Sequence, residues 1–259
     1  MDNRGACARL IHTSLAVWLI ACVAPCRAAE GDNVSVTVGV KEWATDWTTW
    51  RINDVFFGTG RIQINEPLNS ATRVTSTPQV GLRYGDFVAS ASYLATQSYP
   101  LGGSIDSLSA SRSEFDVNAG YTVLPGVALT VGYKQIRQNY GGTTFKWTGP
   151  TLGLAGSAPL GSTQFALYGL YGYGLMKLRD AAGDALHDTL FDANYSLAEA
   201  GLAYVVGVNR FISALRFTVS YRAQILNTRG YQLIGANGYT APNERDFTQG
   251  PTVGVSGSF

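Results

Sequence analysis

The carboxyl-terminal stretch Pro251-Thr-Val-Gly-Val-Ser-Gly-Ser-Phe259 is the most informative part of this chain. Val253, Val255 and Phe259 share one parity, whereas the residues that alternate with them are small or hydroxylated. Alternation with a period of two predicts a β-strand with one apolar face and one polar face. An apolar strand face is buried either in a soluble core or in lipid, so the rest of the chain must distinguish the two environments.

Residues 1–29 have the composition of a secretory signal peptide. Arg4 and Arg9 form a positive region, and an apolar core follows over 10–23. This core is short for a transmembrane helix, and small residues at the end of the segment offer a cleavage site. We therefore expect a cleaved signal peptide over 1–29 and one domain over 30–259.

A second processing route stays open at Cys22. The stretch Leu19-Ile-Ala-Cys22 resembles the bacterial lipoprotein signal, in which the cysteine is acylated and becomes the new amino terminus. All three cysteines, Cys7, Cys22 and Cys26, lie within residues 1–29. We therefore expect no disulfide and no thiolate metal site in the domain over 30–259.

The mature domain is nearly neutral. Without residues 1–28 the 19 basic and 18 acidic residues of the chain fall to 16 and 17, which leaves a net charge of −1. We expect no nucleic acid partner, because binding to nucleic acid needs a basic face. No run after residue 29 is long and apolar enough for a transmembrane helix, so a position in a membrane would require a closed barrel.

Ten segments of the mature domain show the same alternation. The clearest one sets Phe115 and Val117 against Glu114 and Asp116. Strands of about ten residues with a period of two are typical of transmembrane β-barrels. The expected strands lie at about 33–43, 75–84, 87–95, 113–121, 129–134, 151–154, 165–173, 198–204 and 215–224, followed by the strand that ends at Phe259.

The connections between these segments alternate in length. Short connections are expected at 85–86, 123–127, 159–162 and 207–213. Longer and more polar ones are expected at 44–74, 96–112, 137–148, 177–193 and 227–246. Short turns at one end and long loops at the other are typical of outer-membrane barrels. A soluble β-sandwich would account for the strands and turns, but not for this alternation together with a signal peptide and tyrosines at many strand ends.

Taken together, the signal peptide, the alternating strands and the terminal strand resemble bacterial outer-membrane β-barrel proteins over about residues 30–259. The resemblance implies an all-β, closed antiparallel barrel in contact with the lipid of a Gram-negative outer membrane. An even number of strands would place both termini in the periplasm and the longer loops outside. In that class a last strand ending in Phe is the signal for the barrel assembly machinery, which gives this role to Val253, Val255 and Phe259.

The number of strands has two solutions. The segment from Trp47 to Leu68 is β-prone, and Gly58-Thr-Gly60 could be a turn between two more strands, which would make twelve. However, a strand that turns the apolar residues of this segment toward lipid would also turn Asp54 or Glu66 toward lipid. A charge on the lipid face near the midplane costs a few kcal/mol. We therefore expect ten strands with an ordered first loop, with twelve as the alternative.

The parity of the strands also predicts which charged side chains line the lumen. In one interpretation these charges pair with one another and plug the barrel; in the other they line a water path and bias ion passage. Both describe a non-enzymatic barrel, either a narrow pore or a structural and surface-binding barrel. The predicted lumen-lining residues are Arg83, Glu114, Asp116, Lys134, Glu199, Arg216 and Arg222.

The expected first long loop is rich in aromatic residues. One interpretation is a stacking surface for a sugar or another ligand. The other is a strand extension above the membrane, or a loop folded onto the barrel mouth, since aromatic residues are common at membrane interfaces. The aromatic residues concerned are Trp43, Trp47, Trp50, Phe56 and Phe57.

The alternative function is an outer-membrane enzyme with its site at the extracellular mouth. Asp184, His187 and Asp188 share one expected loop, and Asp46 lies in another. Omptin proteases place an Asp pair and a His-Asp pair at this position, and a carboxylate beside an imidazole can orient it as a base. Only the residue types agree with that family. A lipid hydrolase would need a Ser-His pair, and the sequence singles out no serine. We expect no metal and no cofactor.

Overall fold

The computed structural model describes residues 34–57, 60–102, 107–140, 143–180, 191–208, 211–228 and 244–259. The expected signal peptide lies outside these ranges. No helix among the described residues is long and apolar enough to cross a membrane. The strands are β1 (Val34–Phe57), β2 (Gly60–Ser70), β3 (Arg73–Tyr84), β4 (Phe87–Gly102), β5 (Ser107–Leu124), β6 (Val127–Tyr140), β7 (Thr143–Pro159), β8 (Phe165–Asp180), β9 (Phe191–Val206), β10 (Ala214–Thr228) and β11 (Glu244–Ser258).

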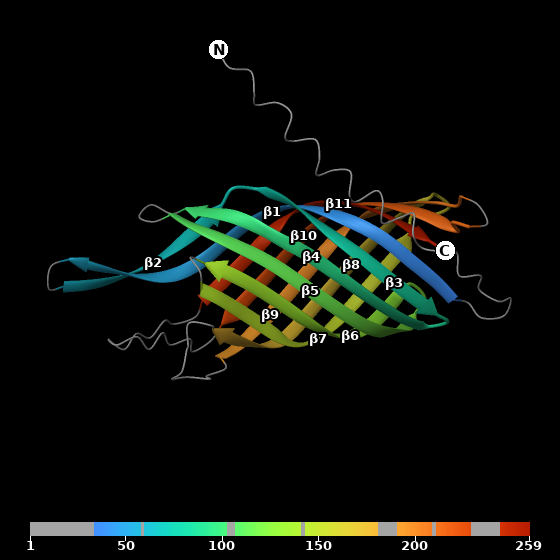
Figure 1. Ribbon diagram of the computed structural model, residues 1–259. Helices are drawn as coiled ribbons and strands as arrows, with labels where there is room; N and C mark the ends of the chain where they lie inside the picture. Colours follow the sequence, from blue (N-terminus) through green and yellow to red (C-terminus); the bar gives the residue numbers. More distant parts are fainter. Residues whose placement is uncertain are drawn as a thin grey trace, which may run out of the picture.

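Ten of the eleven strands close into an antiparallel barrel. Each strand from β3 to β11 pairs with the next one, and β1 closes the ring between β11 and β3. Val38 of β1 is paired with Val80 of β3 on one side, and Val40 is paired with Val255 of β11 on the other. Figure 1 shows the tilted strands wrapping around a common axis. The structure therefore confirms the predicted barrel of ten strands.

The remaining strand, β2, stands outside the wall. It pairs with the far half of β1, from Thr48 with Asn69 to Phe57 with Gly60. This hairpin extends beyond the barrel, away from the carboxyl terminus (Figure 1). The alternative of twelve wall strands is therefore wrong, although the segment is β-structure. Because β2 pairs with β1 over this length and meets β4 only at Asn69 and Ser70, the hairpin adds no strand to the closed wall.

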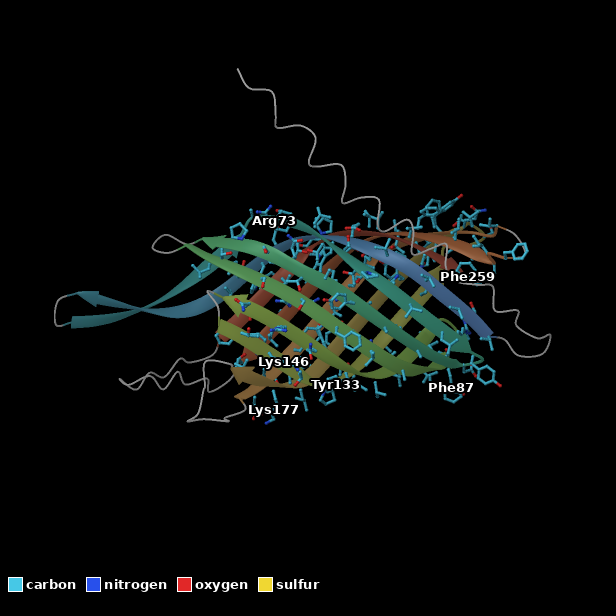
Figure 2. The ribbon with its side chains drawn as sticks, viewed as in Figure 1. Arg73, Phe87, Tyr133, Lys146, Lys177 and Phe259 are labelled. Carbon is cyan, nitrogen blue, oxygen red and sulfur yellow. The ribbon has the colours of Figure 1, made fainter. Side chains whose placement is uncertain are left out.

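The two ends of the barrel differ. The short connections between strands lie at one end, here called the turn end, where Gly85 and Gly126 adopt positive φ angles of 58° and 77° that glycine accepts without strain. Phe259 lies at this end with Phe87, as Figure 2 shows. The opposite end, here called the loop end, carries the β1–β2 hairpin.

The strands reach further toward the loop end than the sequence predicted. The expected loops over 96–112 and 137–148 consist largely of strand, and strand also enters both ends of the expected loops over 177–193 and 227–246. In these extensions apolar side chains such as Tyr99 and Leu101 turn inward and are buried, whereas the exposed side chains are mostly polar. The outward apolar alternation that marks a membrane strand is therefore lost there, although the hydrogen-bonded ladder continues.

The outer face of the barrel carries an apolar belt. Tyr133 of β6 points away from the barrel axis in Figure 2, and its side chain is among the large apolar ones that stay exposed. Aromatic residues flank the belt near the turn end, including Phe87 and Tyr121, whose rings lie 5.2 Å apart. Such a belt with aromatic borders suits a lipid bilayer. Other exposed members are Leu82, Val117, Val131, Leu152, Leu167, Leu202, Val219 and Val253.

Candidate functional site

The inward side chains fill the barrel in successive layers. Nearest the loop end, buried apolar residues form what we call the apolar cap. Below the cap lie two groups of paired charges, and below these a polar space faces the turn end. The apolar cap consists of Trp47, Leu68, Tyr99, Leu101, Ala110, Ile136, Phe145, Trp147, Met176, Leu178, Ala193, Tyr195 and Leu226.

The first charge group is centred on Glu114 of β5. Its carboxylate accepts hydrogen bonds from Arg112 Nε at 2.8 Å and from Lys134 Nζ at 2.7 Å. Lys134 also donates to Asp116 Oδ2 at 2.6 Å. Gln224 of β10 joins the group from across the lumen, because it donates to Glu114 at 3.2 Å and accepts from Arg112 at 3.2 Å. This group therefore ties β5 and β6 to β10.

Aromatic rings of the apolar cap cover the two cations of this group. The Arg112 guanidinium lies 5.6 Å from the ring centroid of Trp47. The Lys134 ammonium lies 4.9 Å from the ring centroid of Tyr195. Cation–π contacts of this kind are worth about 2 kcal/mol when they are desolvated. The cap and the charge group are thus one continuous packed unit.

The second charge group is centred on Glu199 of β9. Lys41 of β1 donates to Glu199 Oε1 at 2.5 Å, and Arg222 of β10 lies 3.8 Å from Oε2. Tyr168 and Ser220 donate to Oε1 at 3.0 and 2.9 Å. One carboxylate therefore faces two cations, and this group carries an excess positive charge.

The side chains of the first group and of the cap are buried inside the barrel. The exposed fraction is 0% for Lys134, Ile136 and Trp47, and 3% for Glu114. A continuous water path would leave the side chains along it partly exposed. Removing one partner from a buried pair typically costs about 3–5 kcal/mol, because the other charge is left uncompensated.

The polar space below is open and rich in cations. A cavity of about 350 Å³ is lined in part by Lys41, Asp116 and Arg222. A second one of about 370 Å³, nearer the turn end, is lined in part by Arg83 and Arg216. We call the two cavities together the vestibule.

The predicted lumen residues divide between these layers. Glu114, Asp116 and Lys134 meet in the first group, and Glu199 and Arg222 meet in the second. Arg83 lies at the turn end, where its Nε donates to Gly85 O at 3.0 Å. The Arg216 guanidinium lies 5.1 Å from the ring centroid of Tyr168. Among the described residues neither of these arginines forms an ion pair with Glu114 or Asp116.

The sequence interpretation missed several inward residues. Arg112 fell in an expected loop, although its parity with Glu114 would have placed it in the lumen if the strand had been extended. Trp43 and Trp47, which were expected in the first long loop, belong to β1 and are buried inside the barrel. The Arg222 guanidinium lies 4.9 Å from the Trp43 ring centroid. These tryptophans therefore serve packing within the lumen.

The candidate residues for catalysis, Asp184, His187 and Asp188, lie outside the described residues. Asp46 is described, and it accepts a hydrogen bond from Thr72 Oγ1 at 2.5 Å on the outer face. Within the described ranges no three His, Cys, Asp or Glu residues are grouped so that they could hold a metal ion.

The terminal strand completes the wall. β11 pairs with β10 on one side and with β1 on the other. Val253 is 54% exposed on the outer face. The main chain of Phe259 exchanges hydrogen bonds with Val36, at 2.8 Å from Phe259 N to Val36 O and at 3.1 Å in return. The last residue is thus part of the ladder that closes the barrel.

No family model and no curated protein matches this chain. Solved structures of low identity do match. The translocator domain of autotransporter NalP from Neisseria meningitidis has 12% identity, a TM-score of 0.41 and 96% coverage of both chains. AlkL in lipid bilayers has 11% identity, a TM-score of 0.40 and coverage of 91% of this chain and 95% of that one.

A trimeric form of OmpT from Vibrio cholerae has 14% identity and a TM-score of 0.32 over 80% of this chain. The matched part is 63% of the OmpT chain, less than two thirds of its length. All three are described as outer-membrane proteins or as a translocator domain. With its closed wall of ten strands and its outward apolar belt, the present chain has the architecture of a bacterial outer-membrane β-barrel.

Proposed function

We propose that this chain is a non-enzymatic outer-membrane barrel whose lumen is closed to ions. The observation that carries the proposal is the burial of Glu114 between Arg112 and Lys134, directly beneath the apolar cap. In the membrane the turn end faces the periplasm and the loop end faces the outside. The barrel assembly machinery reads the last strand, through Val253, Val255 and Phe259.

A narrow ion pore is the competing form of a non-enzymatic barrel. Ions passing through the lumen would have to separate the first charge group and then cross the apolar cap. Each step is opposed, because separating the buried pairs leaves uncompensated charges that cost several kcal/mol, and the cap consists mostly of apolar side chains. The cationic vestibule lies below these layers, toward the turn end.

Planar-bilayer recording tests the closure. The parent barrel should show no stable stepwise currents after insertion. The double substitution Glu114→Ala with Trp147→Ala removes one side chain from the charge group and one from the cap, and it should produce current steps. Lys177→Gln is the matched control, because Lys177 pairs with Asp192 on the exposed surface and should leave the barrel silent. Stable currents through the parent would refute the closure.

A further inference from the structure

The barrel wall is split between β3 and β4 toward the loop end. These strands pair from Tyr84 with Phe87 up to Gln79 with Ser92, and no farther. β3 nevertheless continues to Arg73 with its other edge paired to β1. Among the described residues this part of β3 has no strand partner on the β4 side. We call the interval between 73–78 and 93–100 the β3–β4 split.

The far side of the split is equally well defined. β4 continues beyond Ser92 with its other edge paired to β5 as far as Gly102. Only Leu101 and Gly102 find a second partner, in Ser70 and Asn69 of β2. Both strands therefore remain strands along the split, and the β2 contact bounds it at the loop end. The split is a window in the wall with ordered edges.

Two local features explain why the ladder stops. Pro78 stands at the first unpaired position of β3, and proline has no N–H to donate to a ladder. Across from it β4 shifts its register against β5 between Leu94 and Gln97, which is a β-bulge. A bulge bends its strand and increases the local twist. β4 is therefore carried away from β3 at the place where β3 can no longer donate.

The split begins at the border of the apolar belt that lies toward the loop end. Tyr93, the first residue of β4 beyond the paired part, is 47% exposed on the outer face with the other aromatic residues of the belt. Val74 on the opposite edge is 63% exposed. Lipid cannot satisfy the hydrogen bonds of free strand edges, so closed barrels normally leave none at this depth. An unpaired edge kept there calls for a functional explanation.

Behind the split lies the apolar cap. Tyr99 of β4 points inward and is completely buried, and its ring meets that of Trp47 edge-on at 5.3 Å. The Tyr99 hydroxyl and Thr75 Oγ1 of β3 share a hydrogen bond of 3.1 Å. This bond crosses the split. Tyr99 is therefore one of the side chains, with Leu94 and Thr77, that close the split on its inner side, and its hydroxyl is bonded across the split.

We propose that the β3–β4 split is a lateral portal, through which an uncharged, apolar small molecule passes between the membrane and the apolar cap. The Tyr99 side chain closes the portal, and its hydrogen bond with Thr75 holds it in the closed position. The proposal goes beyond closure of the lumen to ions, since the route runs sideways through the wall. The apolar class of ligand follows from both ends of the route: Tyr93 and Val74 are exposed beside the outer opening, and tryptophan, leucine and tyrosine side chains of the apolar cap lie at its inner end.

The tryptophans of the chain offer a direct test. Trp43, Trp47 and Trp147 are all buried inside the barrel, with exposed fractions of 1%, 0% and 1%. In a Trp50→Phe background of the mature chain, emission therefore reports the interior. The probe is 1-bromododecane, an apolar quencher, added to the barrel in lipid vesicles. We expect the tryptophan emission of the parent to be quenched. Tyr99→Phe and Thr75→Val should both increase the quenching, because each removes the hydrogen bond between Tyr99 and Thr75.

A crosslink across the split provides the second test. Introduced cysteines can be joined specifically, because the chain has no cysteine after residue 29. Ser76→Cys with Ala95→Cys, joined by a short bis-maleimide, ties the two edges together and should remove most of the quenching. The control is Val117→Cys with Tyr133→Cys, an outward pair across the fully paired β5–β6 ladder, treated with the same reagent. Its quenching should equal that of the parent.

Two results would overturn the portal. One is quenching that the crosslink across the split leaves unchanged. The other is a parent and a Tyr99→Phe variant that both resist the quencher. Neither result depends on conductance, so failure of the portal and failure of the ionic closure are told apart.

Discussion

Lys134 Nζ and Glu114 Oε2 form an ion pair of 2.7 Å inside the barrel, with side-chain exposures of 0% and 2%. Their strands, β5 and β6, are neighbours in the wall, and their inward parity brings both charges to the same layer. Arg112 and Asp116 complete a group with two positive and two negative charges. This balance allows the charges to be buried without a net charge beneath the apolar cap.

Glu114→Gln should destabilise the barrel by about 3–5 kcal/mol, because Arg112 and Lys134 are then buried with one carboxylate fewer. The measurement is urea unfolding of the barrel in vesicles, followed by the loss of heat-modifiable migration on a gel. Lys177→Gln is the control, since an exposed pair contributes at most about 1 kcal/mol. Equal effects of the two substitutions would mean that the first charge group is not a buried unit.

Two glycines of neighbouring strands should respond differently to alanine. A Cβ at Gly149 of β7 would lie 2.1 Å from Leu175 O, whereas one at Gly169 of β8 would lie 3.5 Å from Glu199 O. We expect Gly149→Ala to lower stability by about 1–3 kcal/mol, as overpacking does. Gly169→Ala should be close to neutral. The same unfolding assay compares them, and a neutral Gly149→Ala would contradict the close approach of β7 and β8.

Cysteine labelling with a membrane-impermeant maleimide tests which side chains face lipid and which face the lumen. Val117→Cys should be protected by lipid or detergent, because Val117 is on the apolar belt. Asn118→Cys should react, since Asn118 lines the vestibule cavity of about 350 Å³. The reverse pattern would show that the inward and outward faces of the strands are exchanged. The charge groups would then not lie in the lumen.

Deletion of Phe259 should reduce the fraction of protein that folds into the membrane and leave the inserted barrels unchanged. The deletion removes the two main-chain hydrogen bonds with Val36 as well as the terminal aromatic side chain. Phe259→Ala separates these contributions, because it keeps the backbone. Outer-membrane fractionation with heat-modifiable migration measures the outcome, and normal insertion of both variants would remove the assembly role.

His187→Ala addresses the enzymatic alternative. We expect the variant to have the same protease and lipase activity as the purified, folded parent, since the proposed function is non-catalytic. Asp188→Ala is the companion variant, because a catalytic imidazole would need a neighbouring carboxylate to orient it. Activity that is present in the parent and lost in both variants, with folding intact, would reverse the functional assignment.

The sequence alone determined the class of fold and the facing of the side chains inside the membrane. A period of two cannot be satisfied by a helix, so Val117 and Glu114 must lie on opposite faces of a strand. The absence of an apolar helix-length run left a closed barrel as the structure able to span lipid. Both conclusions need only local geometry, which is why they could be reached without coordinates.

Only the tertiary structure decided which charges meet. Lys41 and Glu199 are 158 residues apart, and Arg112 and Gln224 are 112 apart, so their contacts depend on closure and register. The inward turn of Trp47 and the β3–β4 split depend on the same long-range geometry. Parity specifies a face, whereas the depth of a residue and its neighbours across the lumen are set by how ten strands stagger when they close into one barrel.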